Sequence, residues 1–258
     1  GLLTSKLNLE IPLWKERTSL LLSGRTTYSD WIMGMLPEKS GYKDGKAGFY
    51  DIGATFSHTF NKYHKLNIYG YYSRDRFAFN DNEKYGYGNM NISAHWRAIF
   101  SERFMANFSA GYDHYDYKND ESADSVQAAR LSFNIDQYFA KANFNLTLEK
   151  HKLNFGASTM MYNIGAGTYE PLGNLSIVAY DELQKDKALE SAVYVGEEWE
   201  VTPKLSLNAG IRYSMFNAMG PRNYYTYQPG TLPSESTIAD TVRVTGNKVF
   251  KTYHGPEF

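Results

Sequence analysis

Two-residue alternation of apolar and polar side chains, sustained over long segments, is the feature that most constrains how this chain can fold. In residues 50–60, Tyr50, Ile52, Ala54 and Phe56 share one parity, and mostly polar residues and glycine fill the other. Successive side chains of a strand point to opposite faces, so this pattern predicts strands with one apolar and one polar face. Ten strands are predicted, at 3–12, 18–29, 48–60, 64–76, 86–100, 104–116, 128–148, 152–164, 189–201 and 204–217, with an eleventh near 242–253.

The length of the alternating segments favours a membrane barrel over a soluble sandwich. Soluble strands usually run for about 5 to 6 residues, whereas a tilted strand that crosses a bilayer needs about 9 to 11. No run of apolar residues is long enough for a spanning helix. A mean hydropathy of -0.52 is compatible with a barrel, because strands that alternate apolar and polar residues average to a hydrophilic sequence.

The predicted connections alternate between short and long, which is typical of outer-membrane barrels with short periplasmic turns and long extracellular loops. The eight prolines fall at strand ends, turns or loops, where no central ladder donor is lost. The short connections lie near 14–17, 61–64, 101–103, 150–151 and 202–204, and the long ones near 31–46, 77–85, 117–127, 164–188 and 217–241. The predicted fold class is therefore all-β, an antiparallel transmembrane β-barrel.

The large aromatic content, 16% of the residues with 22 tyrosines, suits rings at both membrane interfaces. Trp14, Trp96 and Trp199 lie toward the short turns, whereas Trp31, Tyr112 and other tyrosines lie toward the long loops. The predicted aromatic girdle consists of Trp14, Trp31, Trp96, Tyr112 and Trp199.

Composition also excludes several classes of function. The chain has no cysteine, which excludes a disulfide scaffold, a thiolate zinc site and a cysteine nucleophile. With 27 basic and 28 acidic residues there is no global attraction for nucleic acid. We expect no cofactor, no bound metal and no nucleic-acid partner.

The predicted strand 128–148 changes phase along its length. Leu131, Phe133 and Ile135 are odd-numbered, whereas Phe144 and Leu146 are even-numbered. A change of phase by one residue within a strand predicts a β-bulge, here near 136–139.

Two adjacent segments, 192–199 and 205–213, resemble a hairpin in the barrel of TonB-dependent outer-membrane receptors. The first is an aromatic and acidic strand that ends in Trp199, and the second is a leucine-rich strand that ends in Arg212 and Tyr213. Residues 9–28 look like the first barrel hairpin of Bacteroidetes-type members, and residues 253–258 look like the start of a mid-barrel strand. The likeness implies an about 22-stranded barrel that holds an N-terminal plug and contacts TonB.

The sequence shows neither a plug nor a TonB-contacting box, so we expect residues 1–258 to be one partial β-barrel domain without the plug and the C-terminal half of the barrel. The alternative is a ten-stranded barrel that closes alone. The resemblance implies energised uptake of a scarce nutrient such as a ferric siderophore, and the cell outer membrane as location. The implied partners are outer-membrane lipid, the plug, TonB through the missing N-terminal part, and a small-molecule or iron-chelate cargo. A structural or adhesive small barrel is the alternative, and a barrel enzyme is a third possibility without predicted catalytic residues.

Candidate ligand contacts are rings and charges near the long loops. Arg74 and Arg76 are flanked by aromatic residues and suit an anionic or catecholate chelate through charge and cation-π contacts. An interfacial girdle with an internal Arg-Asp pair is the structural alternative. The segment 113–117 carries oxygen and imidazole donors, but Asp113 and His114 point to opposite faces of a strand and cannot chelate together. The predicted contacts are Arg74, Arg76, Tyr115, Asp116, Tyr224, Tyr225 and Tyr227.

Overall fold

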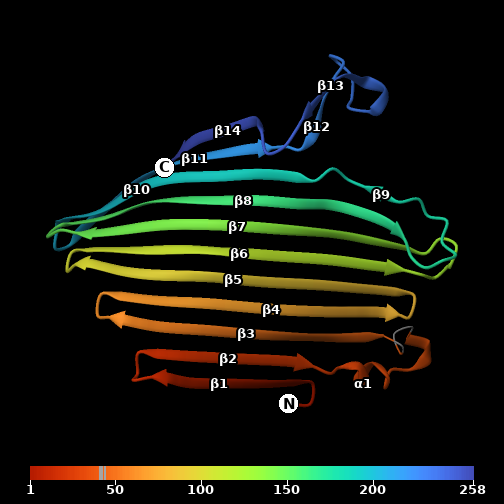
Figure 1. The fold of residues 1–258 in the computed structure, drawn as a ribbon, viewed down its shortest axis with the longest axis horizontal. Helices are drawn as coiled ribbons and strands as arrows, with labels where there is room; N and C mark the ends of the chain where they lie inside the picture. The colour runs from red at the N-terminus through yellow and green to blue at the C-terminus, as the bar shows by residue number, and fades with distance from the viewer. Residues whose placement is uncertain (41–42, 44) are drawn as a thin grey trace.

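The computed structural model describes residues 1–40, 43 and 45–258, which form one large antiparallel sheet and a small second sheet (Figure 1). The strands of the large sheet pair in the order β1-β2-β3-β4-β5-β6-β7-β8-β10-β11-β14, and β9 pairs with β8 beside this path. Their bounds are β1 Thr4–Trp14, β2 Thr18–Thr27, β3 Lys46–Asn61, β4 His64–Asn80, β5 Glu83–Ser101, β6 Phe104–Glu121, β7 Ala129–Thr147, β8 His151–Pro171, β9 Asp181–Glu182, β10 Asp186–Thr202, β11 Leu205–Met219 and β14 Val249–Glu257. The predicted all-β, antiparallel architecture is confirmed.

The small sheet pairs β12 (Arg222–Tyr227) with β13 (Ile238–Val244) and projects from the end of the large sheet that carries the long loops (Figure 1). The remaining regular segments are the helix α1 (Asp30–Met33) and two 3-10 turns, Glu38–Ser40 and Glu235–Thr237. No helix in the described part of the chain is long and apolar enough to cross a membrane.

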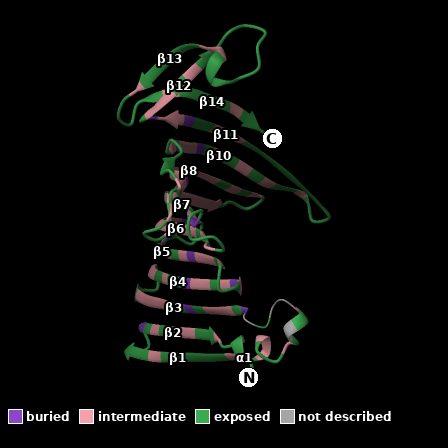
Figure 2. Cartoon of the chain, turned by 90° about the vertical axis from the view of Figure 1, so that its right-hand side faces the viewer, coloured by how far each residue is buried: buried purple, intermediate pink, exposed green. Residues whose placement is uncertain are grey.

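The large sheet is open in the described part of the chain. β1 and β14 are its two edges and do not pair with each other, and the sheet is curved when seen along its strands (Figure 2). The alternative of a ten-stranded barrel that closes alone requires the two ends of the sheet to meet, and this structure does not contain that pairing.

Several strands extend beyond their predicted ends on the long-loop side. The predicted loop 77–85 is instead a strand hairpin, because β4 continues to Asn80 and β5 begins at Glu83. The side-chain oxygen of Asn80 accepts hydrogen bonds from the backbone N–H groups of Asn82 (2.8 Å) and Glu83 (3.0 Å). The side chain of Asn80 thus satisfies two backbone N–H groups of the turn. A two-residue turn therefore connects β4 and β5 where a long loop was predicted.

The register of the sheet sorts its side chains onto two faces. One row runs Leu66, Trp96, Phe108, Ala142 and Ala157 across β4 to β8, and it continues through Val193 and Tyr213. The opposite face carries polar rows such as Asn67, His95, Ser109 and Lys141. In a transmembrane barrel the apolar side chains point to lipid, so we call the first the outer face and the second the inner face.

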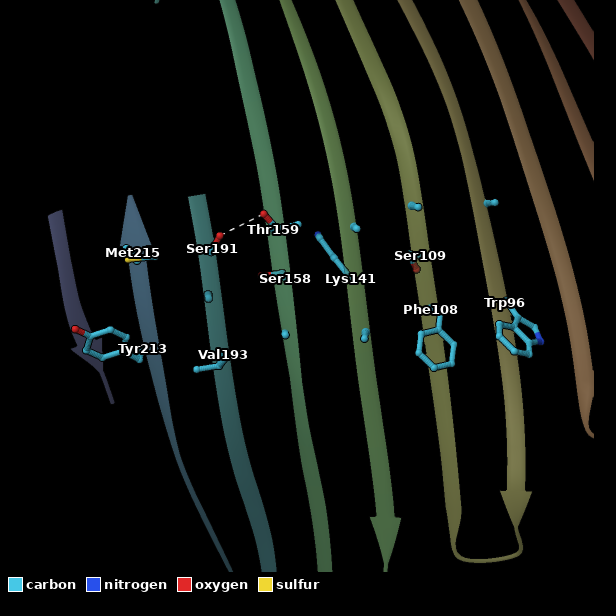
Figure 3. A pocket seen from close by; sticks show the side chains of 16 residues that line it. Trp96, Phe108, Ser109, Lys141, Ser158, Thr159, Ser191, Val193, Tyr213 and Met215 are labelled. Atoms are coloured by element: carbon cyan, nitrogen blue, oxygen red, sulfur yellow. Dashed lines mark hydrogen bonds between the residues drawn. The ribbon is translucent and has the colours of Figure 1, made fainter. Parts of the chain in front are cut away.

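No protein layer covers the outer face in the part of the chain that the structure describes. Large apolar side chains on it remain open, with Ile92 54%, Val193 58% and Leu207 50% exposed, and the buried hydrophobic residues are all alanines. Figure 3 shows part of this face, where a shallow hollow of about 750 Å³ is lined by small residues and by the row of Trp96, Phe108, Val193 and Tyr213. A continuous apolar surface of this kind is stable against hydrocarbon rather than water.

Toward the long-loop ends of the strands, polar side chains lie on the outer face and apolar side chains on the inner face. The outer face becomes charged, with Arg74, Asp116 and Arg130, whereas the inner face becomes aromatic, with Tyr117 and Phe133. This exchange explains the phase change within 128–148. The pairing of β6 with β7 is uninterrupted from 104 to 121, so the predicted bulge near 136–139 is wrong. The register shift of β7 lies instead against β8, between Ser132 and Asn134.

Candidate ligand-binding face

Six aromatic side chains form a patch on the inner face near the long-loop ends of β4 to β7. We call this patch the mouth cluster: Phe77, Tyr85, Tyr87, Tyr115, Tyr117 and Phe133. The ring centroids of Tyr87 and Tyr117 are 5.3 Å apart, and those of Tyr117 and Phe133 are 4.8 Å apart. Phe133 also contacts Tyr115 at 5.9 Å, and Phe77 contacts Tyr85 at 6.3 Å. These separations are those of interacting rings, so the cluster consists of two packed groups on one face: Phe77 with Tyr85, and Tyr87 with Tyr117, Phe133 and Tyr115.

The strand register creates the mouth cluster from residues that are distant in the sequence. Tyr87 pairs directly with Tyr117, and Tyr117 pairs with Phe133. Directly opposed residues on neighbouring strands have Cβ atoms about 4.5–5.5 Å apart, which places their rings in contact. The row of Tyr87, Tyr117 and Phe133 therefore needs three strands in one register, and a shift by one residue would move its rings to the outer face.

Polar groups surround the cluster on the same face. Tyr85 donates a hydrogen bond to the carboxylate of Glu83, beyond the apolar band of the strands, and this raises the pKa of Tyr85 to about 12. Deeper on the inner face, Asn91 donates to Asp113 at 2.5 Å and Asn89 donates to Ser73 at 3.2 Å. The cluster thus combines ring faces for stacking with hydrogen-bonding groups at both of its ends.

The structure does not bring the seven predicted ligand contacts together. Tyr115 lies in the mouth cluster, whereas Arg74, Arg76 and Asp116 lie on the outer face. Arg74 donates to Asp116 at 2.6 Å, with both side chains 22% exposed. Arg76 is exposed and has no ion-pair partner among the described residues. The pair that forms joins Arg74 to Asp116 on β6, outside segment 71–77, so the internal Arg-Asp pair kept as an alternative for this segment stays a prediction.

The three predicted tyrosines of the last long loop lie on β12, in the small sheet. Tyr224 contacts the ring of Phe250 at 5.8 Å, and Tyr225 accepts a 3.5 Å hydrogen bond from Gln184. Tyr224 and Tyr227 are 40% and 37% exposed. Their contact with a ligand stays a prediction. The backbone that carries these rings is held by the pairing of β12 with β13.

Four of the five predicted girdle residues lie on strands, and Trp31 lies on α1. Trp14 and Trp199 are near the short turns, where the rings of Trp199 and His151 stack at 5.9 Å. Trp96 stacks on Phe108 at 5.2 Å, and Tyr112 lies nearer the long loops and contacts Tyr138 at 4.8 Å. Trp96, Tyr112 and Trp199 share the outer face.

Consecutive side chains of the segment 113–117 point to opposite faces of the sheet, as expected for a strand. Asp113 accepts from Asn91 on the inner face, whereas His114 contacts Asp136 at 2.7 Å on the outer face. Among residues 1–40, 43 and 45–258, no three histidine, aspartate or glutamate side chains lie close enough to hold a metal ion.

Sequence reasoning missed five of the six mouth-cluster residues, namely Phe77, Tyr85, Tyr87, Tyr117 and Phe133. The signal that could have found them is the phase change of 128–148, because a chain that moves its apolar residues to the opposite parity without a bulge has moved them to the opposite face. The same change occurs on β4, where Ile68 is outward and Phe77 inward.

The chain matches the family model described as "TonB dependent receptor-like, beta-barrel" over residues 18–250. A search of curated protein sequences finds no match.

Among solved structures, the open form of the ferric-catecholate import receptor Fiu from E. coli K12 matches with a TM-score of 0.65 at 10% identity, over 98% of this chain and 48% of that one. The copper transporter OprC matches with a TM-score of 0.69 at 10% identity, over 98% and 39%. The ferric preacinetobactin receptor BauA from Acinetobacter baumannii matches with a TM-score of 0.62 at 12% identity, over 83% and 39%.

This chain therefore spans less than half the length of each of these structures. The likeness shows a shared fold, and the family model covers most of the sequence. The chain belongs to the TonB-dependent receptor β-barrel family.

Proposed function

We propose that the chain is the partial barrel of an outer-membrane receptor that takes up a scarce nutrient, and that its cargo is a ferric siderophore or a similar iron chelate. The family consists of receptors and transporters, which are not enzymes, and its members are outer-membrane proteins. The observation that carries the proposal is the mouth cluster, an aromatic patch on the inner face at the end of the strands that bears the long loops.

The chemistry of the cluster suits an aromatic iron chelate. Its rings offer stacking surfaces to a planar ligand, and each such contact contributes about 0.5–1.5 kcal/mol beyond area burial. The named relatives support a chelate as cargo, since two of them are receptors for a ferric catecholate and for ferric preacinetobactin. Another is a copper transporter, so the metal itself has to be tested.

The remaining parts of the proposal follow from family membership. Residues 1–258 would be one portion of a larger barrel whose plug closes the lumen and whose N-terminal region engages TonB. Within that barrel the mouth cluster would be an early contact for cargo that enters between the extracellular loops. The polar rows of the inner face, such as Asn67, His95 and Lys141, would line the water-filled path below it.

The test removes two stacked rings from the mouth cluster in the receptor expressed from its complete gene. We expect Tyr87→Ala/Tyr117→Ala to weaken binding of the ferric complex of 2,3-dihydroxybenzoate by roughly ten-fold or more, because two ring contacts are lost. Binding is measured by titration of the purified receptor, and uptake of the same labelled complex is measured in a receptor-deletion strain complemented with each variant.

The matched control is Tyr138→Ala, which removes a ring from the outer face. It is expected to leave cargo binding unchanged. If the double variant and this control bind the ferric complex equally well, the mouth cluster is not the cargo site. If the deletion strain grows unchanged on every iron source and fails only with copper, the iron-chelate proposal is wrong.

A further inference from the structure

A second hollow, of about 620 Å³, lies mainly on the outer face beyond its apolar rows, and its lining is basic. We call it the basic hollow. Six of its lining side chains are cations: Lys46, Arg74, Arg76, Lys84, Lys118 and Arg130. The acidic lining residues are three, Asp30, Asp81 and Asp120. Cations therefore outnumber anions on a surface that belongs to the outside of the barrel.

Three of these cations form no close ion pair among the described residues, although Lys84 and Lys118 act on Asp120 at longer range. Arg74 pairs with Asp116, Arg130 with Asp120 at 2.6 Å, and Lys46 with Asp81 at 3.7 Å. Arg76, Lys84 and Lys118 make no ion pair in the part of the chain that the structure describes, and all three are exposed. Their charge is available to an anion from outside the chain.

Glycines form the floor between two of the free cations. Gly86 pairs with Arg76 on one side and with Lys118 on the other, and Gly48 pairs with Arg76 on the next strand. A Cβ atom on Gly86 would meet only the carbonyl oxygen of Asp75, at 4.0 Å. The outer face is thus open between the two cationic side chains, and an oxyanion can approach both of them.

The height of the hollow coincides with the edge of the apolar band. Ala98 and Gly88 lie on the outer face of β5, ten residues apart. At ~3.4 Å per residue and a tilt of ~40°, this separation is about 25 Å along the membrane normal, which is the height of the apolar band in such barrels. Gly86 follows one outward position beyond Gly88, so the basic hollow lies at the level of lipid headgroups, on the side of the long loops.

We propose that the basic hollow binds a phosphate group of an anionic lipid in the outer leaflet, with Arg76 and Lys118 as its direct contacts across Gly86. Clusters of Lys and Arg at a membrane surface attract anionic headgroups, and Arg offers a fork that matches phosphate geometry. The position argues for a bilayer lipid rather than a free ion, because the acyl chains of the same molecule would lie on the apolar rows below, beside Met90 and Ile92.

The test uses the receptor expressed from its complete gene, in phosphatidylcholine nanodiscs that contain fluorescently labelled, bis-phosphorylated lipid A. Energy transfer from the receptor's tryptophans measures binding. Arg76→Gln/Lys118→Gln is expected to weaken binding by roughly 25-fold, at about five-fold for each cation removed. Gly86→Val keeps all charges but fills the floor, and it is expected to weaken binding as well.

The charge-matched control is Arg103→Gln, at the short turn between β5 and β6, which is expected to bind as the unaltered receptor does. Lipid A without phosphate is expected to bind all forms equally weakly. Unchanged binding in both the double variant and Gly86→Val would overturn the proposal. Displacement of the labelled lipid by inorganic phosphate alone would also overturn it, since the site would then take free anions.

Discussion

At the scale of single residues, Gly88 has a defined steric role. The ion pair between Arg74 on β4 and Asp116 on β6 passes directly over the strand between them. A Cβ atom on Gly88 would lie 2.2 Å from Asp116 Oδ2 and 2.4 Å from Arg74 Nη1. Glycine is required there because the space of a side chain is already occupied by the pair.

We predict that Gly88→Ala lowers the free energy of unfolding by about 1–3 kcal/mol, the usual cost of forcing an extra group into occupied space. Chemical unfolding of the receptor in detergent measures the change. Gly70→Ala, on the outer face of the neighbouring strand β4, is the matched control, because its Cβ atom would meet nothing within 4 Å.

The ion pair between Arg74 and Asp116 allows a stricter test of the steric role of Gly88. In an Arg74→Ala background the space above Gly88 is vacated, so the added cost of Gly88→Ala is expected to shrink, as residues in contact are not additive. Equal costs in both backgrounds would contradict this account of Gly88.

At the scale of elements, alternation predicted where the long strands lie in the sequence, because each strand keeps one parity apolar across the membrane. It could not predict their far ends. On β4 both Ile68 and Phe77 are apolar but face opposite ways. Beyond the apolar band the outer face meets water, so the physical rule that assigns parity to a face no longer holds.

The mouth cluster was unpredictable for a related reason. Its rings come from β4, β5, β6 and β7, and only the register places Tyr87 beside Tyr117 and Tyr117 beside Phe133. The local segment 113–117 alone predicts Tyr115 as a ligand contact. The partners of Tyr115 lie on other strands, at distances along the chain that no local pattern specifies.

The hairpin end formed by β6 and β7 is predicted to be sensitive to acid. The hydrogen bond from Arg130 holds the pKa of Asp120 below its ordinary value, at the end of the hairpin and outside the apolar band. A carboxyl group with a lowered folded-state pKa contributes stability above its unfolded pKa, near 3.9, and this contribution is lost as the pH falls through the folded value.

We therefore expect segment 122–128 to open more often in the unaltered receptor at strongly acidic pH than at pH 7, as measured by hydrogen exchange. Asp120→Asn should show a roughly two- to five-fold increase in opening already at pH 7, the size expected for one partly exposed ion pair. Glu121→Gln is the neighbouring control. If segment 122–128 exchanges at the same rate in Asp120→Asn as in this control at pH 7, the ion pair does not stabilise the end of the hairpin.

At the scale of the whole molecule, the assignment of outer and inner faces can be tested directly because the chain has no cysteine. A single cysteine introduced into a cysteine-free receptor is a unique labelling site. We predict that a spin label on Ile68→Cys, in a bilayer, is relaxed by lipid-soluble oxygen. A label on the adjacent Asn67→Cys is expected to be relaxed by a water-soluble nickel complex. Identical behaviour at both positions would contradict the two-faced sheet.

The exchange of character between the two faces has a mechanical consequence for the barrel. If the strands sank by one pair of residues toward the short turns, Arg74 and Asp116 would move about 5 Å toward the hydrocarbon, where the cost of an arginine rises from about 0–1 kcal/mol near the interface to about 2–4 kcal/mol at the midplane. If the strands rose by the same amount, the lowest apolar rows would leave the bilayer. The side chains of the sheet therefore fix its depth in the bilayer. The strands can tilt to suit a thinner or thicker bilayer, but a shift along the membrane normal is unfavourable in either direction.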